Sequence, residues 1–426
     1  MLILLLKVVK IAKITTLSRQ ISTKIVKLKG CVTLEYKLLS KLYYKDKNEY
    51  EEVYTRRFNS ESSYHFNIKI SGNEAFCCLI PEIFNLCNEI SNTDKLVFAL
   101  ASKLPQAAIS QFAAKSLVDE IILTNDIEGV YSTRKEINLI LKDAKTKDTK
   151  KRFEGLVAKY KMLSKAQIPL KTCEDIRNIY DELVLSEVVE DDPGNMPDGM
   201  IFRKDVAEVT TATQKVIHKG LYPEEKVIDY MEQALRILND EAIPLPIRIS
   251  IFHYLFGYIH PFYDGNGRTS RFISSYLLSK EYEYLIGYRL SYTIKENISD
   301  YYEAFKLCND EKSKGDLTPF VIMFLKIIKK SMDNLFDALY KRKEDLEKYS
   351  ALISKISGID QDLSYVLLQG ALFSNLGIDK NDLCETLQIG KSTLSKRLNK
   401  IDELGYLVIK KNGRSNYYSF DINCLK

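Results

Sequence analysis

The spacing of hydrophobic residues separates a short β-containing stretch from a long helical one. Between residues 50 and 80, apolar and β-branched residues form three runs. The runs are separated by Asn59-Ser60 and by Ser71-Gly72-Asn73, both of which are turn sequences. We therefore expect strands at Val53–Phe58, Tyr64–Ile70 and Ala75–Ile80.

From about residue 81 onward the pattern becomes helical. Apolar residues recur three and four positions apart, beginning with Ile83, Leu86 and Ile90. The pattern predicts helices through most of the chain to residue 350, interrupted by Asp191–Gly199 and a short β-like run after it. Thr318-Pro319 predicts the start of a long helix, with Thr as the N-cap and Pro at the first helical position.

The last 70 residues have a different organisation. Ser357-Gly358 marks a plausible boundary, and Asn412-Gly413 is a hairpin turn between two alternating runs. The pattern predicts helices at 361–373, 380–387 and 391–404, and strands at Tyr406–Lys411 and Ser415–Phe420. Helices joined by a tight turn and followed by a hairpin are typical of a winged helix-turn-helix domain.

Composition is that of a globular chain, since 45% of the 426 residues are hydrophobic and 28% are charged. This length suggests more than one domain. The eight cysteines form no CxxC pair, which favours a reduced, cytoplasmic location. The longest apolar run, Met1–Leu6, is far shorter than the roughly 20 residues of a membrane span, so we expect no membrane association.

The net charge of +5 hides two basic ends. Residues 1–30 contain seven basic residues and no acidic one, and residues 387–426 contain eight basic residues against three acidic ones. The first segment is interpreted as a basic tail, with a targeting or membrane-surface helix as the alternative. The second could face an anionic partner.

The segment from His260 to Arg271 has the residues that a phosphate site needs. It links two apolar, helical stretches, so its Asp-Gly-Asn-Gly loop begins a helix, where unpaired N–H groups attract anions. Arg268 and Arg271 are three residues apart and share a helix face, from which both can bind phosphate. Asp264 suits Mg²⁺, and His260 suits a general base. These residues predict phosphoryl or nucleotidyl transfer.

The same segment resembles the Fic family signature HxFx(D/E)GNGRxxR, which it matches without a departure. The resemblance implies transfer of AMP from ATP, with Mg²⁺, to a Ser, Thr or Tyr hydroxyl of a target protein. It implies that His260 deprotonates that hydroxyl and that Asp264 holds the metal. The implied nucleotide-binding residues of the segment are Asp264, Gly265, Asn266, Gly267, Arg268, Thr269, Ser270 and Arg271.

The likeness extends over roughly residues 90–345 and implies a mainly α fold with a β-hairpin flap. Arg203–Lys219 resembles that flap, which places Val216, Ile217, His218 and Lys219 beside the nucleotide. In that position, His218 is more often an ordinary flap or surface residue than a catalyst. Tyr301, Tyr302 and Asn309 resemble residues near the adenine, with packing as the competing interpretation of the tyrosines. His253, seven residues before His260 on an apolar helix, is interpreted as a satisfied core histidine.

Residues 124–129, Thr-Asn-Asp-Ile-Glu-Gly, resemble the family's inhibitory motif (S/T)xxxE(G/N). The motif lies upstream of the catalytic segment, as in the subclass with an N-terminal inhibitory helix. The resemblance implies that Glu128 inhibits the enzyme, and the chemistry of a carboxylate and a guanidinium predicts that it pairs with Arg271. By itself, Glu-Gly is also an ordinary helix end.

The C-terminal helices and hairpin predict a surface for duplex DNA. The tentative DNA-binding residues lie on the third helix and the hairpin: Lys391, Lys396, Arg397, Lys400, Lys411 and Arg414. A winged helix used only for docking a partner or for dimerisation is the alternative.

The predicted organisation has four parts: a basic tail at 1–30, a region of strands and helices at 31–110, a catalytic core at 111–350 with an inhibitory helix at 117–129, and a winged helix at 358–426. The predicted function is protein adenylyltransferase, using Mg²⁺ and ATP on an unidentified target protein. Self-modification and homodimerisation stay open. The rival functions are a DNA-binding regulator whose core only senses nucleotide, and a related enzyme that removes AMP or uses another nucleotide-like donor.

Overall fold

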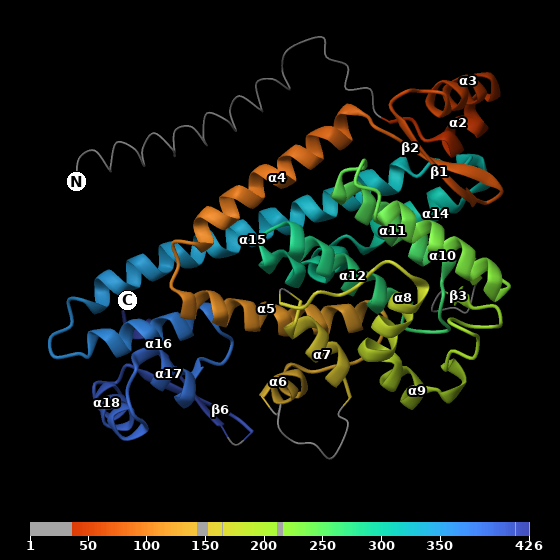
Figure 1. Ribbon diagram of the computed structural model, residues 1–426. Helices are drawn as coiled ribbons and strands as arrows, with labels where there is room; N and C mark the ends of the chain where they lie inside the picture. The colour runs from red at the N-terminus through yellow and green to blue at the C-terminus, as the bar shows by residue number, and fades with distance from the viewer. Residues whose placement is uncertain (1–35, 143–151, 164, 211–215, 414, 426) are drawn as a thin grey trace, which may run out of the picture.

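The computed structural model describes residues 36–142, 152–163, 165–210, 216–413 and 415–425 (Figure 1). It is mainly helical, with three small antiparallel sheets, as the sequence predicted. Within the described residues no helix has the length and apolar character needed to cross a bilayer. The predicted basic tail at 1–30 lies outside the described residues.

The N-terminal region consists of two helices and a hairpin: α2 (Leu39–Lys45), α3 (Lys47–Phe58), β1 (Ser63–Ile70) and β2 (Asn73–Cys78). The two strands confirm the predicted runs to within two residues. The strand expected at Val53–Phe58 is wrong, because this segment is the second half of α3.

Helix α3 forms because its cap and its packing outweigh the β propensity of its aromatic and branched residues. The Asp46 carboxylate accepts hydrogen bonds from the N–H groups of Asn48 and Glu49, which satisfies the start of the helix. Tyr54 and Phe58, four residues apart on one face, contact the ring of Phe76 in β2, with centroids 6.1 and 5.4 Å away. The periodicity is therefore helical.

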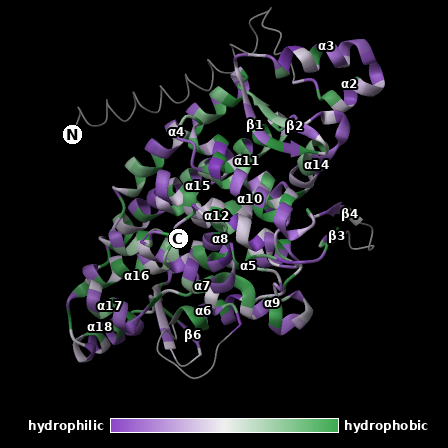
Figure 2. Ribbon diagram, turned by 45° about the vertical axis from the view of Figure 1, so that its right-hand side comes forward, coloured by the Kyte–Doolittle hydropathy of each residue, from purple (hydrophilic) through white to green (hydrophobic). Residues whose placement is uncertain are grey.

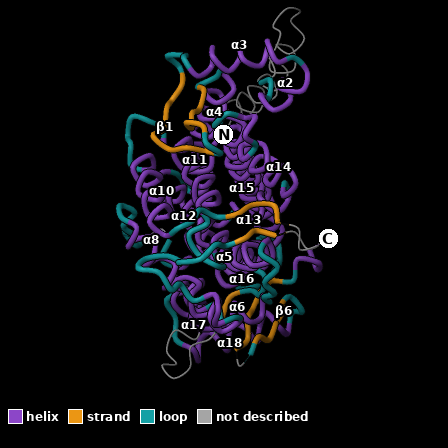
Figure 3. Tube along the Cα trace, turned by 90° about the vertical axis from the view of Figure 1, so that its right-hand side faces the viewer, coloured by secondary structure: helices purple, strands orange, loops and turns teal. Residues whose placement is uncertain are grey.

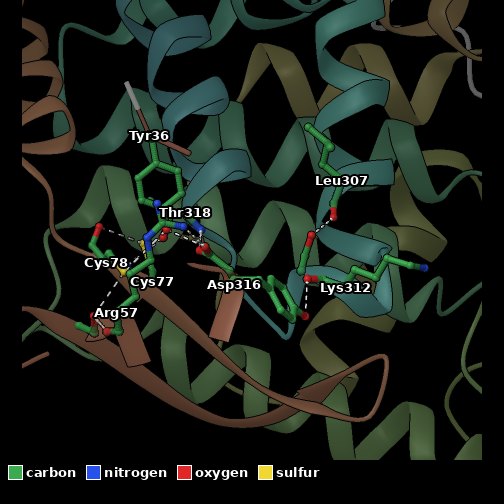
Figure 4. A network of polar contacts seen from close by, with 11 residues as sticks. Tyr36, Arg57, Cys77, Cys78, Leu307, Lys312, Asp316 and Thr318 are labelled. Carbon is green, nitrogen blue, oxygen red and sulfur yellow. Dashed lines mark hydrogen bonds and ion pairs between the residues drawn. The ribbon is translucent and has the colours of Figure 1, made fainter. Parts of the chain in front are cut away.

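A buried carboxylate, Asp316, joins this region to the long helix α15 (Thr318–Ile353), as Figure 4 shows. Asp316 accepts a 2.6 Å hydrogen bond from the Tyr36 hydroxyl and lies 3.5 Å from Arg57 Nη1. It also accepts from the N–H of Thr318, at 3.0 Å. Because Asp316 holds the start of the helix, Thr318 is the first helical residue, and its predicted role as N-cap is wrong. The Thr318 hydroxyl accepts from Cys78 N instead.

The centre of the molecule is a stack of long helices. Helix α4 (Pro81–Ala101) lies along α15, and α11 (Leu245–Ile259) and α12 (Asn266–Glu281) pack beneath them (Figure 1). Figure 2 shows hydrophobic residues running through these central helices. Around them lie the remaining helices of this part of the chain: α6 (Arg134–Lys142), α7 (Glu154–Lys161), α8 (Cys173–Tyr180), the π-helix η1 (Asp181–Leu185), α9 (Ser186–Asp191), α10 (Glu224–Leu238), α13 (Leu290–Glu296) and α14 (Ile298–Asn309), with short 3₁₀ turns at Pro193–Asn195, Tyr284–Tyr288 and Glu311–Ser313.

The C-terminal residues form three helices and a three-stranded sheet at the end of the molecule opposite β1 and β2, as Figures 1 and 3 both show. The helices lie within one residue of their predicted bounds. The elements are α16 (Gln361–Phe373), β5 (Ile378–Asp379), α17 (Lys380–Leu387), α18 (Lys391–Glu403), β6 (Leu407–Asn412) and β7 (Ser415–Phe420), with strand order β5-β7-β6 and a final 3₁₀ turn at Ile422–Leu425.

Helix α5 (Gln106–Ile127) contacts both the central stack and the C-terminal elements. Its second half includes the predicted inhibitory segment and packs against α12 and α13. Its first half contributes Phe112, whose ring lies 5.1 Å from the guanidinium of Arg342 in α15. Arg342 in turn donates a 3.1 Å hydrogen bond to the carbonyl of Leu372 in α16. Helix α5 is therefore shared between the two parts of the chain.

Candidate active site

The loop between α11 and α12 is held in a sharp turn by two left-handed residues and one side chain. His260, at the C-cap of α11, has φ 54°, and Gly265, at the N-cap of α12, has φ 78°. The Asn266 side chain accepts from Phe262 N at 3.0 Å and donates to Phe262 O at 2.8 Å. For a non-glycine residue such as His260, this backbone conformation costs on the order of 1–3 kcal/mol.

Phe262 fixes the loop to the body of the molecule. Its ring is fully buried and stacks on Tyr180 at the end of α8, with 3.6 Å between centroids and an interplanar angle of 10°. Gly265 lies close to the ring of Tyr180, because a Cβ at Gly265 would be 3.2 Å from it. The loop between α11 and α12 is therefore packed against the end of α8.

The start of α12 presents free backbone N–H groups. The first bond of its helical ladder runs from Thr269 N to Gly265 O, so the N–H groups of Asn266, Gly267 and Arg268 precede that ladder. The hydroxyls of Thr269 and Ser270 donate to the carbonyls of Gly265 and Gly267. These two hydroxyls thus bond within the first turn of α12. The free N–H groups at the start of the helix can bind an anion.

Arg268 is buried and has donors to spare. Its Nη1 donates to Glu187 of α9 at 3.0 Å, and both side chains are at most 2% exposed. Its Nε and Nη2 have no hydrogen-bond partner among the described residues, although Nη2 lies 3.5 Å from Asp264. Burial raises the pKa of Glu187 to about 7. A phosphate oxygen would satisfy the two unpaired donors.

Arg271 is held by the end of α5. Its Nη1 donates to Glu128 at 2.7 Å, while Nε and Nη2 donate to the hydroxyl and the carbonyl of Thr124, each at 2.8 Å. The pairing of Glu128 with Arg271, predicted from the sequence, is therefore present. The Glu128 carboxylate also lies over the start of α12, because a Cβ at Gly267 would be only 2.0 Å from its Oε1.

Two further side chains fix α5 in this position. Both oxygens of Glu120, which is 1% exposed, accept from Ser291 N at 3.0 Å, and Asp126 pairs with Lys295 at 2.9 Å. Burial raises the pKa of Glu120 to about 7. Glu120 and Glu187 were missed by sequence reasoning. For Glu120 a signal exists, since it precedes Thr124 and Glu128 by one and two helical turns on the same face.

His260 is half-buried and its basicity is weak. Burial, followed by the nearby His218 and Arg203, lowers its pKa to about 4, although Glu128 acts to raise it. The imidazole is therefore neutral at pH 7, the state that can accept a proton. The role of base stays a prediction.

Asp264 lies at the edge of the loop with 44% of its side chain exposed. Its Oδ1 accepts from the adjacent Gly265 N at 2.6 Å. The described residues contain no cluster of three or more His, Cys, Asp or Glu side chains able to hold a metal. One carboxylate beside a phosphate site fits Mg²⁺, which is commonly bound by one or two carboxylates and the phosphates of its substrate.

The predicted flap is the hairpin of β3 (Glu208–Thr210) and β4 (Val216–Lys219). The His218 ring donates through Nε2 to the carbonyl of Tyr258 at 2.7 Å, and Lys219 pairs with Glu208 across the hairpin at 2.7 Å. Both predicted nucleotide contacts thus have partners within the protein. The side chains of Val216 and Ile217 lie outside the described part of the chain.

The remaining predicted residues separate into core and surface. His253 is confirmed as a satisfied core histidine, because its ring nitrogens bond to the hydroxyls of Ser274 at 2.9 Å and Tyr301 at 2.7 Å, and burial lowers its pKa to about 3. Asn309 accepts from the Tyr254 hydroxyl at 2.7 Å. Tyr302, by contrast, is 47% exposed. Partial burial is the main cause that raises its pKa, and the negative charge of Glu128 is the second.

The candidate DNA-binding residues are not equivalent. Lys391, Lys396 and Lys400 on α18 and Lys411 on β6 are exposed, whereas Arg397 makes two hydrogen bonds, of 2.5 and 2.6 Å, to Asp360, the N-cap of α16. Arg397 therefore holds the three-helix unit together. Arg414 lies outside the described residues.

Comparison with known proteins agrees with this site. Residues 170–278 match the profile of the Fic/DOC family. The chain is 37% identical over 106 residues to the protein adenylyltransferase Fic of Drosophila erecta and 40% identical over 106 residues to that of Drosophila persimilis. These matches cover 24% of this chain and 20% and 19% of the two relatives, so the chain spans about a fifth of their length.

A similar structure is that of a Fic family protein from Desulfovibrio desulfuricans G20, with a TM-score of 0.49 and 20% identity. The superposition covers 80% of this chain and 96% of that protein.

Proposed function

We propose that this chain is a protein adenylyltransferase that transfers AMP from Mg-ATP to a hydroxyl group of a target protein. The observation that carries the proposal is the placement of a neutral His260 directly before a helix start with free N–H groups and two buried arginines. The match to the Fic/DOC family and the relatives' names support the same activity.

The residues divide the reaction between them. The N–H groups at the start of α12 and the spare donors of Arg268 bind the phosphates, and Arg271 adds a second guanidinium once it is free. His260 accepts the proton of the attacking hydroxyl at one of its ring nitrogens. Bound beside Asp264, Mg²⁺ would neutralise charge that develops on the phosphates. Positioning and charge stabilisation therefore provide most of the catalysis.

The enzyme is proposed to be inhibited by Glu128. This carboxylate occupies Arg271 and covers Gly267, so it competes with a nucleotide phosphate for the arginine and for the space at the helix start. Like charges within a few ångströms repel strongly, and a phosphate cannot share this position with a carboxylate.

The test is incubation of the full chain with ATP labelled on the α-phosphate, with and without Mg²⁺, followed by gel autoradiography and intact-mass measurement. Transfer of AMP to the chain itself or to an added protein extract, lost in His260→Ala and retained in His65→Ala, supports the enzyme. Nucleotide binding without transfer, in both wild type and Glu128→Gly, would support the nucleotide sensor instead. A mass other than that of AMP would indicate another donor.

The second candidate function is duplex DNA binding by a winged helix at residues 358–426. The supporting observation is the exposure of Lys391, Lys396, Lys400 and Lys411 on a helix followed by a hairpin. This function adds to the transferase activity, and its test is the salt dependence of binding to a DNA duplex.

A further inference from the structure

Three carbonyl groups at the end of α11, those of Tyr258, Ile259 and His260, are bound by the flap segment and the residues that follow it. At a helix end these carbonyls lack intrahelical partners. Tyr258 O accepts from the His218 ring at 2.7 Å, Ile259 O from Leu221 N at 3.0 Å, and His260 O from Arg203 Nε at 2.9 Å. The base of the flap therefore replaces the next turn of the helix that ends at His260.

Arg203 is the centre of this arrangement. Its side chain is fully buried, and besides His260 it donates to Leu221 O at 2.9 Å through Nη2 and to Asp205 O through Nη1. Gly220 provides the room, because a Cβ there would lie 2.3 Å from Arg203 Nη2 and 2.9 Å from His260 Cβ. One guanidinium thus ties both ends of the flap hairpin to the histidine.

We propose that Arg203 is a positioning residue for His260: by binding the His260 carbonyl and both ends of the flap, it fixes the imidazole relative to the surface on which a target protein docks. This inference rests on the proposed transferase function. The backbone at His260 is left-handed, so the conformation persists only because its surroundings impose it. A displacement of about 1 Å in a catalytic group can cost on the order of 10² in rate.

The charge of Arg203 gives the proposal a second observable. Three charged or titratable groups face His260: Arg203, His218 on β4 and Glu128 at the end of α5. After burial, His218 and Arg203 lower the pKa of His260, and Glu128 raises it. Removing the guanidinium should therefore raise the pKa of His260.

A matched control exists on α11, the helix that ends at His260. Arg248 of α11 also binds a helix-end carbonyl, that of Leu238, at 2.9 Å, but it lies twelve residues before His260. Arg248→Met removes the same kind of bond without approaching the site.

The experiment compares Arg203→Met, Arg203→Lys and Arg248→Met in the full chain. In the Glu128→Gly background, Arg203→Met should lower kcat for AMP transfer by about tenfold or more, with KM for ATP changed by less than about twofold, because ATP contacts other residues. Arg203→Lys, which keeps the charge but not the planar fork, should recover part of kcat. Arg248→Met should match its parent.

Histidine titration by NMR provides the second measurement. The chain has only four histidines, so His260→Ala identifies the signal. The pKa of His260 should rise in Arg203→Met and stay near its original value in Arg203→Lys. A folded Arg203→Met variant with unchanged kcat and an unchanged His260 titration would overturn the proposal.

If Arg203→Met does not fold, Gly220→Ala replaces it. This change keeps every charged group but places a methyl between Arg203 and His260. Reduced kcat in folded Gly220→Ala supports the proposal, and unchanged kcat overturns it. If no variant transfers AMP, even with Glu128 removed, the proposed function has failed, and the histidine titration still shows whether the charge of Arg203 lies beside the imidazole.

Discussion

Replacing Glu128 by glycine should activate the enzyme. The change frees Arg271 and opens the space above Gly267, whereas most substitutions at a catalytic site lower activity. Arg271 is 1% exposed and the Glu128 side chain 27% exposed, so their 2.7 Å contact is a partly buried, charge-assisted bond. Such bonds contribute about 1.5–3 kcal/mol. At about 1.4 kcal/mol per factor of ten, release should raise AMP transfer about 10- to 100-fold.

Initial rates of label incorporation, measured against ATP concentration, provide the assay. Glu128→Gln separates charge from bulk: its amide still fills the space over Gly267, so it should activate less than glycine does. Asp126→Asn is the matched control. Asp126 lies two residues before Glu128, and its ion pair is with Lys295 rather than with Arg271. Arg271→Ala, alone or combined with Glu128→Gly, should stay inactive.

The reasoning fails if Glu128→Gly, shown by circular dichroism to be folded, labels protein no faster than the wild type. The glutamate would then be an ordinary helix-end residue. Equal activation by Asp126→Asn would also refute it, since the effect would then come from loosening of α5 rather than from freeing Arg271.

Four other predictions concern the loop, the pH dependence of transfer and the C-terminal residues. Phe262→Ala should lower the free energy of unfolding by about 3–5 kcal/mol, because it removes a fully buried ring stacked at 3.6 Å, and differential scanning calorimetry would detect it. Protonation of His260 should reduce transfer as pH falls through its pKa, about 4, rather than 6.5; an NMR titration that places the pKa of His260 near 6.5 would contradict this. Neutralising Lys396 and Lys411 should reduce the salt dependence of DNA binding by roughly one unit of slope per lost contact, measured by fluorescence anisotropy. Arg397→Ala should instead lower the melting temperature, because its two bonds to the start of α16 are lost.

Local signals in the sequence were sufficient for much of the fold. The C-terminal helices were predicted to within one residue, because local signals such as Gly405, just after α18, mark their ends. The strand expected at Val53–Phe58 failed for the opposite reason. Its aromatic residues contact Phe76, which is distant in the sequence, and the capping residue Asp46 lies seven residues before Val53. Tertiary packing therefore makes residues 53–58 helical, and their composition alone could not predict this.

The candidate site divides in the same way. The residues from His260 to Arg271 and the partner of Arg271 followed from contiguous motifs. The Glu187–Arg268 bond and the Arg203–His260 bond did not, because each joins segments more than fifty residues apart that only folding brings together. His218 illustrates the limit, since its position on the flap was predicted but its bond to Tyr258 was not.

The position of α5 determines which fragments of this chain would be informative. Helix α5 carries the residues that hold Arg271 at one end, and near the other it packs on α16 through Phe112 and Arg342. In addition, Gly413 at the tip of the β6–β7 hairpin lies against α6, where a Cβ on the glycine would be 3.1 Å from Leu139. A shortened protein that ends before α16 would uncover an apolar face on the helix that carries Glu128, and such faces promote self-association. The basal rate of AMP transfer by such a fragment would reflect an α5 that lacks its contacts with α16. Kinetic comparisons of inhibition therefore require the chain with α16–α18 present.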